Sequence, residues 1–342
     1  MNAGYAMSNA VHESSDPAPE LSADRPTISI VTASFNQAPY LRATLDSVLN
    51  QEGKGEEFDL QYIVIDGGST DGSKEIIEEY AGDLSYWRSA PDEGHYAAIN
   101  EGFGHARGDV LAWLNSDDRY CPWALRTVAA IFSQNPDVDW LTTTRPIIWS
   151  RTGLCAELMA SPGYSVKSLL AGCHMVGGRP FLGWVQQEST FWRRELWETV
   201  AAETDAEEAG TKGGALRPRF SVAADYDLWL RFAQHARLDT VESPLGGNRR
   251  QPGQRSMRLI ERSLDELREA LAEARAKVGL PPLTDRVPLL DRVKGHRRPS
   301  RIYRHLRGYF RDAQRFEGRI FKLENPAAEQ ARWVPEKTEF PY

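Results

Sequence analysis

The sequence predicts an α/β protein built on a mostly parallel sheet that carries helices on both faces. Strand-like and helix-like segments alternate four times within about 120 residues, which is typical of βαβ units. Two apolar runs, 60–65 and 111–114, end abruptly in polar turns that contain aspartates. Because open α/β sheets bind their ligands beyond the carboxyl ends of the strands, we expect the functional site where these two runs end.

The expected elements follow in a regular order from residue 26. Pro26 precedes the first β-rich run, and Asn36 is a candidate N-cap for a helix with apolar residues at i, i+4, i+7 and i+8 from Leu41. We expect strands over 27–32, 60–65, 84–87, 110–114 and 140–143. We expect helices after Asn36 and over 73–80, 94–106, 122–132, 224–236 and 257–278.

Composition limits the possible classes of protein. The chain has 342 residues, of which 41% are hydrophobic and 26% charged, as in a soluble globular protein of one large or two smaller domains. Its net charge of -7 does not favour nucleic acid as a partner. The three cysteines have no CxxC spacing, which fits a reduced compartment without structural zinc. No apolar run approaches a bilayer span, and residues 1–25 predict a disordered tail instead of a signal peptide, so we expect a cytoplasmic protein.

The segment 111–118, Leu-Ala-Trp-Leu-Asn-Ser-Asp-Asp, ends an apolar run in an amide, a hydroxyl and two adjacent carboxylates. An acid pair at the end of a buried strand is costly unless its charge is compensated, and a divalent cation bridging phosphates would compensate it. A capped turn is the alternative, since Asn115 and Ser116 favour turns and Asp117 can cap a helix. The second acidic turn, 66–72, favours the metal.

Three other nucleotide-binding classes lack their motifs in this chain. A nucleotidyltransferase would have a Gly-rich phosphate loop directly after the first strand, where this chain has Thr-Ala-Ser-Phe-Asn. No GxGxxG of a dinucleotide-dependent dehydrogenase follows a strand, and no GxxxxGK[ST] of a P-loop NTPase is present.

Three segments in order and in register, 28–36, 64–72 and 113–118, resemble the inverting glycosyltransferases of family 2, over roughly residues 26–256. The resemblance implies the GT-A fold, a nucleotide-sugar donor with UDP-sugars favoured, and Mn²⁺ or Mg²⁺ as cofactor. It also implies a glycan or lipid-linked acceptor in surface polysaccharide or glycolipid synthesis. A catalytically inactive GT-A-fold binding or scaffold subunit stays open as an alternative, and so does a sugar nucleotidyltransferase.

The resemblance further implies contacts to the donor. The family residue that matches Asp66 accepts a hydrogen bond from the base, although an Asp here also suits a turn. Asp92 begins a stretch similar to the family's Asp-x-Gly-x-x-x-Ala-x-Asn-x-Gly, in which the Asp approaches the donor ribose or sugar. Phe35 either offers an aromatic face to the base or packs in the core. Residues 248–256 resemble a loop that closes over the diphosphate, or are simply solvated. The further expected donor contacts are Thr32, Ser34, Asn100, Asn115, Ser116, Arg250 and Gln254.

The metal motif departs from the family's usual Asp-x-Asp, because Asn115 stands at its first position. A neutral amide oxygen is a weaker ligand than a carboxylate. We therefore expect Asp117 to carry most of the coordination, with Asp118 as a second or outer ligand.

The expected base lies in the segment 222–231, which matches the family's acidic stretch before a helix. Many members have Glu-Asp where this chain has Ala-Asp, and we assign Asp225 as the group that takes the acceptor's proton. Asp227 is the alternative, or else an acid that complements the helix dipole. Glu188 and Trp184 are the expected acceptor contacts.

The chain divides into three expected parts: a disordered tail over 1–25, a GT-A domain over 26–256, and a helical, basic C-terminal extension over 257–342. Within the domain, 26–120 would bind the nucleotide sugar and 121–256 the acceptor. Between 291 and 322 eleven Lys or Arg stand against three acids, and apolar residues from Ile302 to Ile320 form one helical stripe. Such a helix can lie on an anionic membrane surface, or its stripe can dock on the catalytic domain.

Overall fold

The computed structural model describes residues 25–176, 181–211, 213–251, 258–283, 315–326 and 332–341. Its strands are β1 (Thr27–Ser34), β2 (Asp59–Asp66), β3 (Tyr86–Ser89), β4 (Val110–Trp113), β5 (Arg119–Tyr120), β6 (Trp140–Thr143), β7 (Ile147–Trp149), β8 (Cys155–Leu158), β9 (Phe191–Arg193), β10 (Leu238–Val241), β11 (Gly246–Arg249), β12 (Arg315–Glu324) and β13 (Arg332–Pro341). Its helices are α1 (Ala38–Leu49), α2 (Ser73–Glu79), α3 (His95–Gly104), α4 (Ala124–Gln134), α5 (Val166–Leu170), α6 (Arg194–Ala202), α7 (Ala206–Ala209), α8 (Ala224–Phe232) and α10 (Ile260–Lys277), with 3₁₀ turns η1 (Ala81–Asp83) and η2 (Gln187–Ser189).

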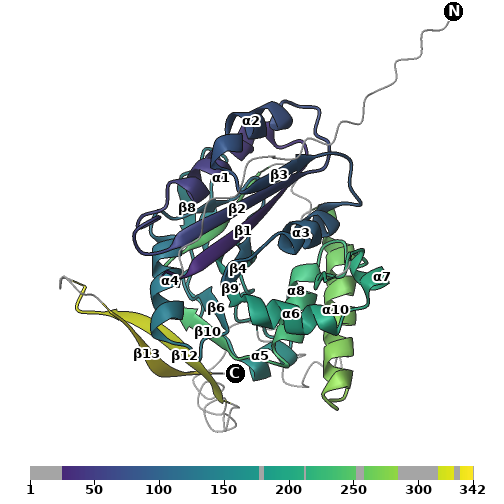
Figure 1. Cartoon of the computed structure of the whole chain (residues 1–342). Coiled ribbons are helices and arrows are strands. Elements are labelled where there is room, and N and C mark those ends of the chain that lie inside the picture. Colours follow the sequence, from purple (N-terminus) through teal and green to yellow (C-terminus); the bar gives the residue numbers. More distant parts are fainter. Residues whose placement is uncertain are drawn as a thin grey trace, which may run out of the picture.

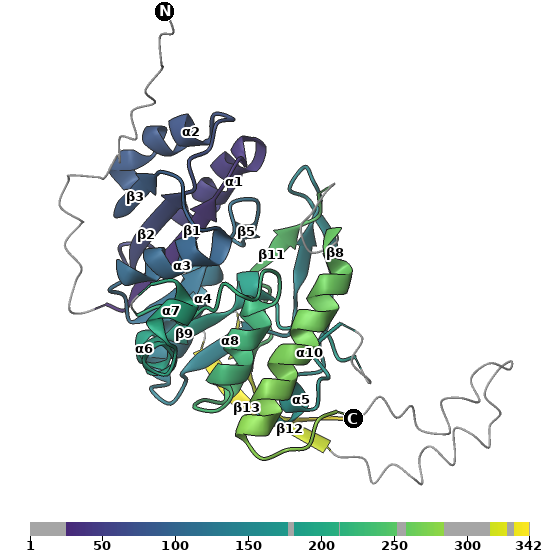
Figure 2. The same ribbon diagram turned by 90° about the vertical axis from the view of Figure 1, so that its right-hand side faces the viewer.

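Within these ranges a nine-stranded sheet has the order β13-β12-β10-β6-β9-β4-β1-β2-β3, and a smaller sheet has the order β5-β11-β7-β8. In the large sheet only β9 and β13 pair antiparallel to their neighbours. Helices α1 and α2 lie on one side of β1–β3, and α3 lies on the other (Figures 1 and 2). The predicted α/β class with a mostly parallel, helix-flanked sheet is confirmed.

The register of the central strands brings the predicted polar turns to one edge. Ser34 at the end of β1 pairs with Asp66 at the end of β2, and Val31 pairs with Trp113 at the end of β4. Every residue of β1 and β4 is buried, as expected for parallel strands covered on both faces. Asn36 is not the predicted cap of α1: the cap position is Gln37, and Asn36 adopts a left-handed φ of 53°.

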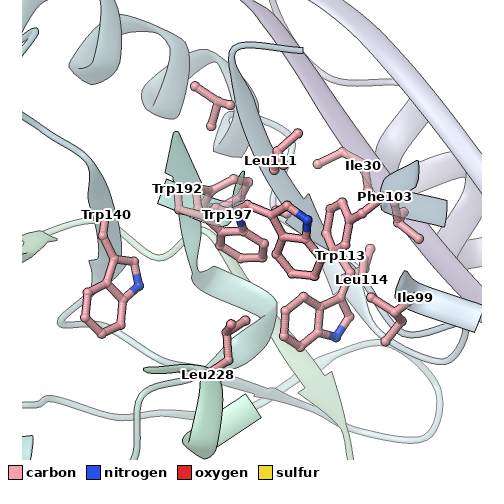
Figure 3. Close-up of a cluster of buried hydrophobic side chains, with 14 of the residues drawn as sticks. Ile30, Ile99, Phe103, Leu111, Trp113, Leu114, Trp140, Trp192, Trp197 and Leu228 are labelled. Atoms are coloured by element: carbon pink, nitrogen blue, oxygen red, sulfur yellow. The ribbon is translucent and has the colours of Figure 1, made fainter. Parts of the chain in front are cut away.

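A cluster of aromatic side chains fills the core beneath this edge. Figure 3 shows Trp113, Trp192 and Trp197 gathered around Phe103. The ring of Trp113 also stacks on Trp229 of α8, with centroids 5.7 Å apart. Aromatic pairs of this kind contribute about 0.5–1.5 kcal/mol each beyond their burial. These rings pack β4, β9 and α8 against one another. The segment after β4 and the first turn of α8 are therefore anchored to the same aromatic core.

The C-terminal extension is only partly helical, which corrects the prediction. The helix expected over 257–278 is present as α10, but 315–322 lies in strand β12 instead of an amphipathic helix. Strand β12 pairs with β10 through Thr240↔Ile320 and with β13 along its full length. Pairing with β10 covers an otherwise open strand edge, and this tertiary gain outweighs the helical spacing of the apolar residues. The rest of the predicted stripe, 291–314, lies outside the described residues.

No helix in the described part of the chain is both long and apolar enough to cross a membrane. Strands β12 and β13 belong to the same large sheet as β1, so the expected boundary at 256 does not separate a second sheet.

Candidate active site

The turn after β4 is held in place from α1. The Oγ1 of Thr44 donates to the carbonyl oxygens of Ser116, at 2.9 Å, and Asp118, at 2.8 Å. The amide of Asp118 donates to the carbonyl of Asn115 at 3.0 Å, which closes the turn. The backbone of the predicted metal motif is therefore fixed before any ligand arrives.

The side chain of Asn115 presents its oxygen as a free acceptor. Its Nδ2 donates to Oδ2 of Asp118 at 2.9 Å and to Oε1 of Gln187 at 3.3 Å, which orients the amide. Gln187 is itself held, since its Nε2 donates to the carbonyl of Trp113 at 2.5 Å. The Oδ1 of Asn115 is buried and has no hydrogen-bond partner among the described residues. A buried acceptor without a partner costs about 1–3 kcal/mol, and a cation ligand would remove that cost.

The two aspartates of the motif differ in what already holds them. Oδ1 of Asp118 accepts from the backbone amide of Arg249 at 2.7 Å, and its Oδ2 accepts from Asn115. Oδ2 of Asp117 accepts from Nε2 of Gln251, while its carbonyl accepts from Nε of Arg249 at 2.6 Å. Asp117 thus keeps the less occupied carboxylate, which agrees with its expected larger share in binding a metal.

The donor set fits a divalent cation that is also bound by a phosphate ligand. Burial raises the pKa of Asp117, and burial together with the charges of Asp117 and Glu188 raises that of Asp118 well above its ordinary value. A cation would relieve this crowding of negative charge. In the described ranges no three His, Cys, Asp or Glu side chains converge on one metal position. Mg²⁺ is typically held by one or two carboxylates together with substrate phosphates, so Asp117 and the oxygen of Asn115 are a sufficient protein contribution.

Two further acids lie at the same edge. Glu188, in η2, is buried, and burial with the charges of Asp225 and Asp117 raises its pKa to about 7. Asp225 lies in the first turn of α8, where burial with the charges of Asp227 and Glu266 raises its pKa to about 6. Its Oδ1 accepts from the amide of Tyr226 at 2.8 Å. A carboxylate with this pKa suits general-base chemistry near neutral pH.

Asp227, the alternative base, has a structural role. Its side chain is 2% exposed and is held by the guanidinium groups of Arg217 and Arg231, the latter at 2.8 Å. Both oxygens accept hydrogen bonds from these groups. Asp227 is therefore occupied by its ion pairs, whereas none of the ion pairs among the described residues includes Asp225.

Of the residues expected near the nucleoside, Asp66 is buried in its own turn and Asp92 is exposed. Asp66 is fully buried and accepts from Gly68 N, Ser69 N, Ser69 Oγ and Ser89 Oγ at 3.1, 2.9, 2.5 and 2.7 Å, so it shapes its own turn. Asp92 is exposed, and a Cβ on Gly67 would lie 2.9 Å from its Oδ2, so the two turns meet closely.

The end of β1 and the loop after it contain one exposed ring and one buried hydroxyl without a partner among the described residues. Phe35 is 61% exposed, which contradicts the core alternative. The Oγ of Ser34 is buried without a partner among the described residues. Ser34 pairs in register with Asp66, so both lie at the same end of neighbouring strands.

Several expected donor contacts have structural partners instead. Thr32 is buried with its Oγ1 3.0 Å from the hydroxyl of Tyr62, because it lies inside β1 below the strand end. Asn100 uses both ends of its amide on the loop before α8: Nδ2 donates to the carbonyls of Ala209 and Leu216, each at 2.8 Å, and Oδ1 accepts from the amide of Leu216 at 3.0 Å. Arg250 pairs with Glu157 at 2.9 Å. Ser116 is buried, and Gln254 lies outside the described residues.

The segment before η2 carries an exposed aromatic pair, of which the sequence analysis had named only Trp184. Trp184 and Phe181 are 37% and 45% exposed, and their rings stack with centroids 6.0 Å apart. The carbonyl of Trp184 accepts from the hydroxyl of Tyr164 at 2.9 Å, which fixes the loop. Sequence analysis also missed Gln187 and Gln251, since neutral amides carry no pattern that marks them as site residues.

The largely parallel, helix-flanked sheet, with acids and amides at its strand ends, has the architecture of a GT-A-type domain. Residues 29–152 match the family model described as glycosyl transferase family 2. The predicted resemblance to the family 2 glycosyltransferases is confirmed over this part of the chain.

Curated relatives match the same part of the chain. An uncharacterized glycosyltransferase of Mycobacterium tuberculosis is 42% identical over 95 residues, which is 28% of this chain and 35% of the relative. The putative glycosyltransferase EpsH of Bacillus subtilis is 34% identical over 110 residues, which is 30% of this chain and 31% of the relative. The chain thus spans about a third of the length of these relatives.

Solved structures share the fold over a longer part. TarS of S. aureus has a TM-score of 0.51 at 15% identity and covers 76% of this chain and 41% of its own. The mannosyltransferase PcManGT of Pyrobaculum calidifontis, solved with GDP-Man and Mn²⁺, has a TM-score of 0.51 at 17% identity and covers 75% of this chain and 66% of its own. At these identities the likeness establishes the GT-A fold.

Proposed function

We propose that this protein is an inverting glycosyltransferase. It moves a sugar from a nucleoside-diphosphate sugar, with UDP-sugars favoured, to a hydroxyl of a glycan or lipid-linked acceptor in surface polysaccharide or glycolipid synthesis. The observation that carries the proposal is the group of acids at one sheet edge, in which Glu188 interacts with both Asp118 and Asp225. This group sets a cation site beside a base. TarS of S. aureus in complex with UDP-GlcNAc, and PcManGT in complex with GDP-Man and Mn²⁺, support a nucleotide-sugar donor and a divalent metal.

Different side chains would bind the diphosphate and the nucleoside of the donor. Asp117 and the free oxygen of Asn115 would hold Mn²⁺ or Mg²⁺, with Asp118 in the outer shell because both of its oxygens are occupied. When bound, the cation neutralises charge that builds on the leaving diphosphate. Asp92, Ser34 and Phe35 would meet the nucleoside, which is supported by the exposure of Phe35 and the unpartnered hydroxyl of Ser34.

The acceptor is activated from the other side of the site. Asp225 takes the proton of the acceptor hydroxyl while that oxygen attacks the anomeric carbon opposite the leaving group, which inverts its configuration. With a pKa of about 6, Asp225 is ionised at neutral pH and still basic enough to accept the proton. The stacked rings of Trp184 and Phe181 suit the apolar face of a sugar, and Glu188 follows Trp184 by four residues in the chain.

Calorimetric titration with UDP, GDP, CDP and dTDP, each with and without Mn²⁺, tests this proposal on the wild type and on Asp117→Ala. Asp265→Ala, at an acid that is 80% exposed on α10, is the control. Metal-dependent binding of one nucleotide that is lost only in Asp117→Ala supports the donor class and the metal site together. Tight binding that ignores Mn²⁺ would refute the metal site. Binding of none of the four nucleotides would favour the inactive scaffold.

A further inference from the structure

Helix α8, which carries Asp225, begins without a capping side chain of its own. Its N-cap is Ala223, which has no side-chain acceptor for the amides at the start of the helix. The first amides of any α-helix lack partners within that helix, and the turn that leads into it needs partners as well. These partners must therefore come from elsewhere in the fold.

Glu266 of α10, 43–45 residues further along the chain, supplies the partners for the turn that leads into α8 and for its N-cap amide. Its Oε1 accepts from Ser221 N at 3.0 Å and Ser221 Oγ at 2.8 Å, and its Oε2 accepts from Val222 N at 2.8 Å and Ala223 N at 3.1 Å. Arg262, one turn earlier on α10, donates to Oε1 at 2.8 Å. Burial alone would raise the pKa of Glu266, but hydrogen bonds from Val222 and Arg262 hold that pKa below its ordinary value.

The position of Glu266 is itself rigid. The residue is 7% exposed and lies on the buried face of α10 with Leu267, Ala270 and Leu271. Figure 2 shows α10 running beside α8. The body of α8 is anchored separately, because Trp229 stacks on Trp113 with centroids 5.7 Å apart. Glu266 thus holds the turn that leads into α8, and the aromatic core anchors the rest of the helix.

We propose that Glu266 is a positioning residue that holds the turn 221–223 and thereby aims the carboxylate of Asp225 at the acceptor hydroxyl. This inference rests on the proposed function of Asp225 as the base. Asp225 follows Ala223 by two residues, so a change in this turn moves its side chain directly. A shift of about 1 Å in a catalytic group can cost about a hundredfold in rate. Glu266 lies outside residues 29–152, so an element beyond the family segment would set the geometry of the reaction.

The test compares Glu266→Gln with Glu269→Gln, the same chemical change at an exposed residue of α10 that pairs with Arg219. The new amide NH₂ at position 266 would face backbone N–H groups, and donors cannot satisfy donors. We expect kcat for the release of nucleotide from UDP-glucose, UDP-GlcNAc or GDP-mannose to fall about 10- to 100-fold. The Kd of the matching nucleotide with Mn²⁺ should stay within about twofold.

Two further readouts separate positioning from a general loss of structure. Amide hydrogen exchange at 221–223 should become faster in Glu266→Gln and stay unchanged in Glu269→Gln. The acid limb of the pH–rate profile should move to lower pH, because the negative charge of Glu266 that helps to raise the pKa of Asp225 is then removed. Ser221→Ala removes one hydrogen-bond donor to Glu266 without leaving a buried group unpaired. It should cause a smaller loss of kcat than Glu266→Gln, with the same free energy of unfolding as the wild type.

The outcomes are distinct. Unchanged amide exchange in Glu266→Gln overturns the inference whether or not a donor has been identified. Unchanged kcat with faster exchange, or a raised nucleotide Kd with kcat intact, overturns it too. Full activity of Asp225→Asn would instead refute the base assignment in the proposed function, independently of Glu266.

Discussion

The substitution Asp225→Asn should make the protein more stable and less active at the same time. Folding raises the pKa of Asp225 from 3.8 to about 6, so the folded protein prefers the protonated acid. The shift of about two units corresponds to about 3 kcal/mol if it is fully expressed. Asp225 is only partly buried by surface area, so we expect about 1–2 kcal/mol. Asparagine has the shape of the neutral form and should recover this free energy of unfolding at pH 7.5.

The sign of the effect depends on pH in a defined way. The stabilising contribution of Asp225 is complete below pH 3.8 and is lost as the pH rises through about 6. The advantage of Asp225→Asn should therefore be full above pH 7, about half as large at pH 5, and absent below pH 3.8. Turnover of the wild type should follow the same group and fall about tenfold from its plateau by pH 5.

Urea unfolding at pH 7.5 and pH 5 would test the predicted gain in stability. Nucleotide release from the active donor would test the predicted loss of activity. Asp227→Asn is the matched comparison two residues away. Because Asp227 is ion-paired with Arg217 and Arg231, its loss should destabilise the fold by about 3–5 kcal/mol. The reasoning fails if Asp225→Asn lowers stability at pH 7.5, or if it retains more than about a hundredth of wild-type turnover.

Further substitutions test other parts of the site. Asn115→Asp should tighten Mn²⁺ binding about tenfold in calorimetry and lower the melting temperature in EDTA, since it adds a charge beside Asp118. Asn100→Ala should cost about 1–3 kcal/mol of unfolding free energy while nucleotide affinity is unchanged, because its three hydrogen bonds hold the loop before α8. Trp184→Ala should raise the KM for the acceptor and leave nucleotide Kd unchanged. Replacing the Lys and Arg residues of 291–311 by Glu should weaken flotation with anionic vesicles; equal binding would refute the membrane contact, and strands β12 and β13 must stay intact in this test.

Sequence patterns predicted the elements whose structure is determined by residues close to one another in the chain. The central strands, α1 to α4 and the polar turns at 66 and 115–118 follow from alternation and from apolar runs that end in acids. Thr32 shows the limit of this reasoning: it is close to the strand end in sequence, but the pleat turns its hydroxyl to Tyr62 inside the sheet.

Long-range pairing explains what the sequence could not predict. Residues 315–322 have apolar residues at helical spacing, yet β10 offers a free edge and the segment pairs there. The partner that decides its structure lies about 80 residues earlier in the chain. Glu266 is a similar case, since a Glu within a charged helix gives no sign of the turn at 221–223 that it holds.

The two sides of the candidate site are brought together by different features of the sheet. The parallel strands β1, β2 and β4 end at one edge, and their order alone brings the metal motif and the first loop together. The proposed acceptor residue Glu188 reaches that edge because β9 runs antiparallel between β4 and β6, which returns Glu188 to the end of β4. A substitution in β1 or β2 should then affect nucleotide binding first. One in β9, α8 or α10 should affect transfer while the nucleotide still binds, and this separation follows from the topology of the sheet.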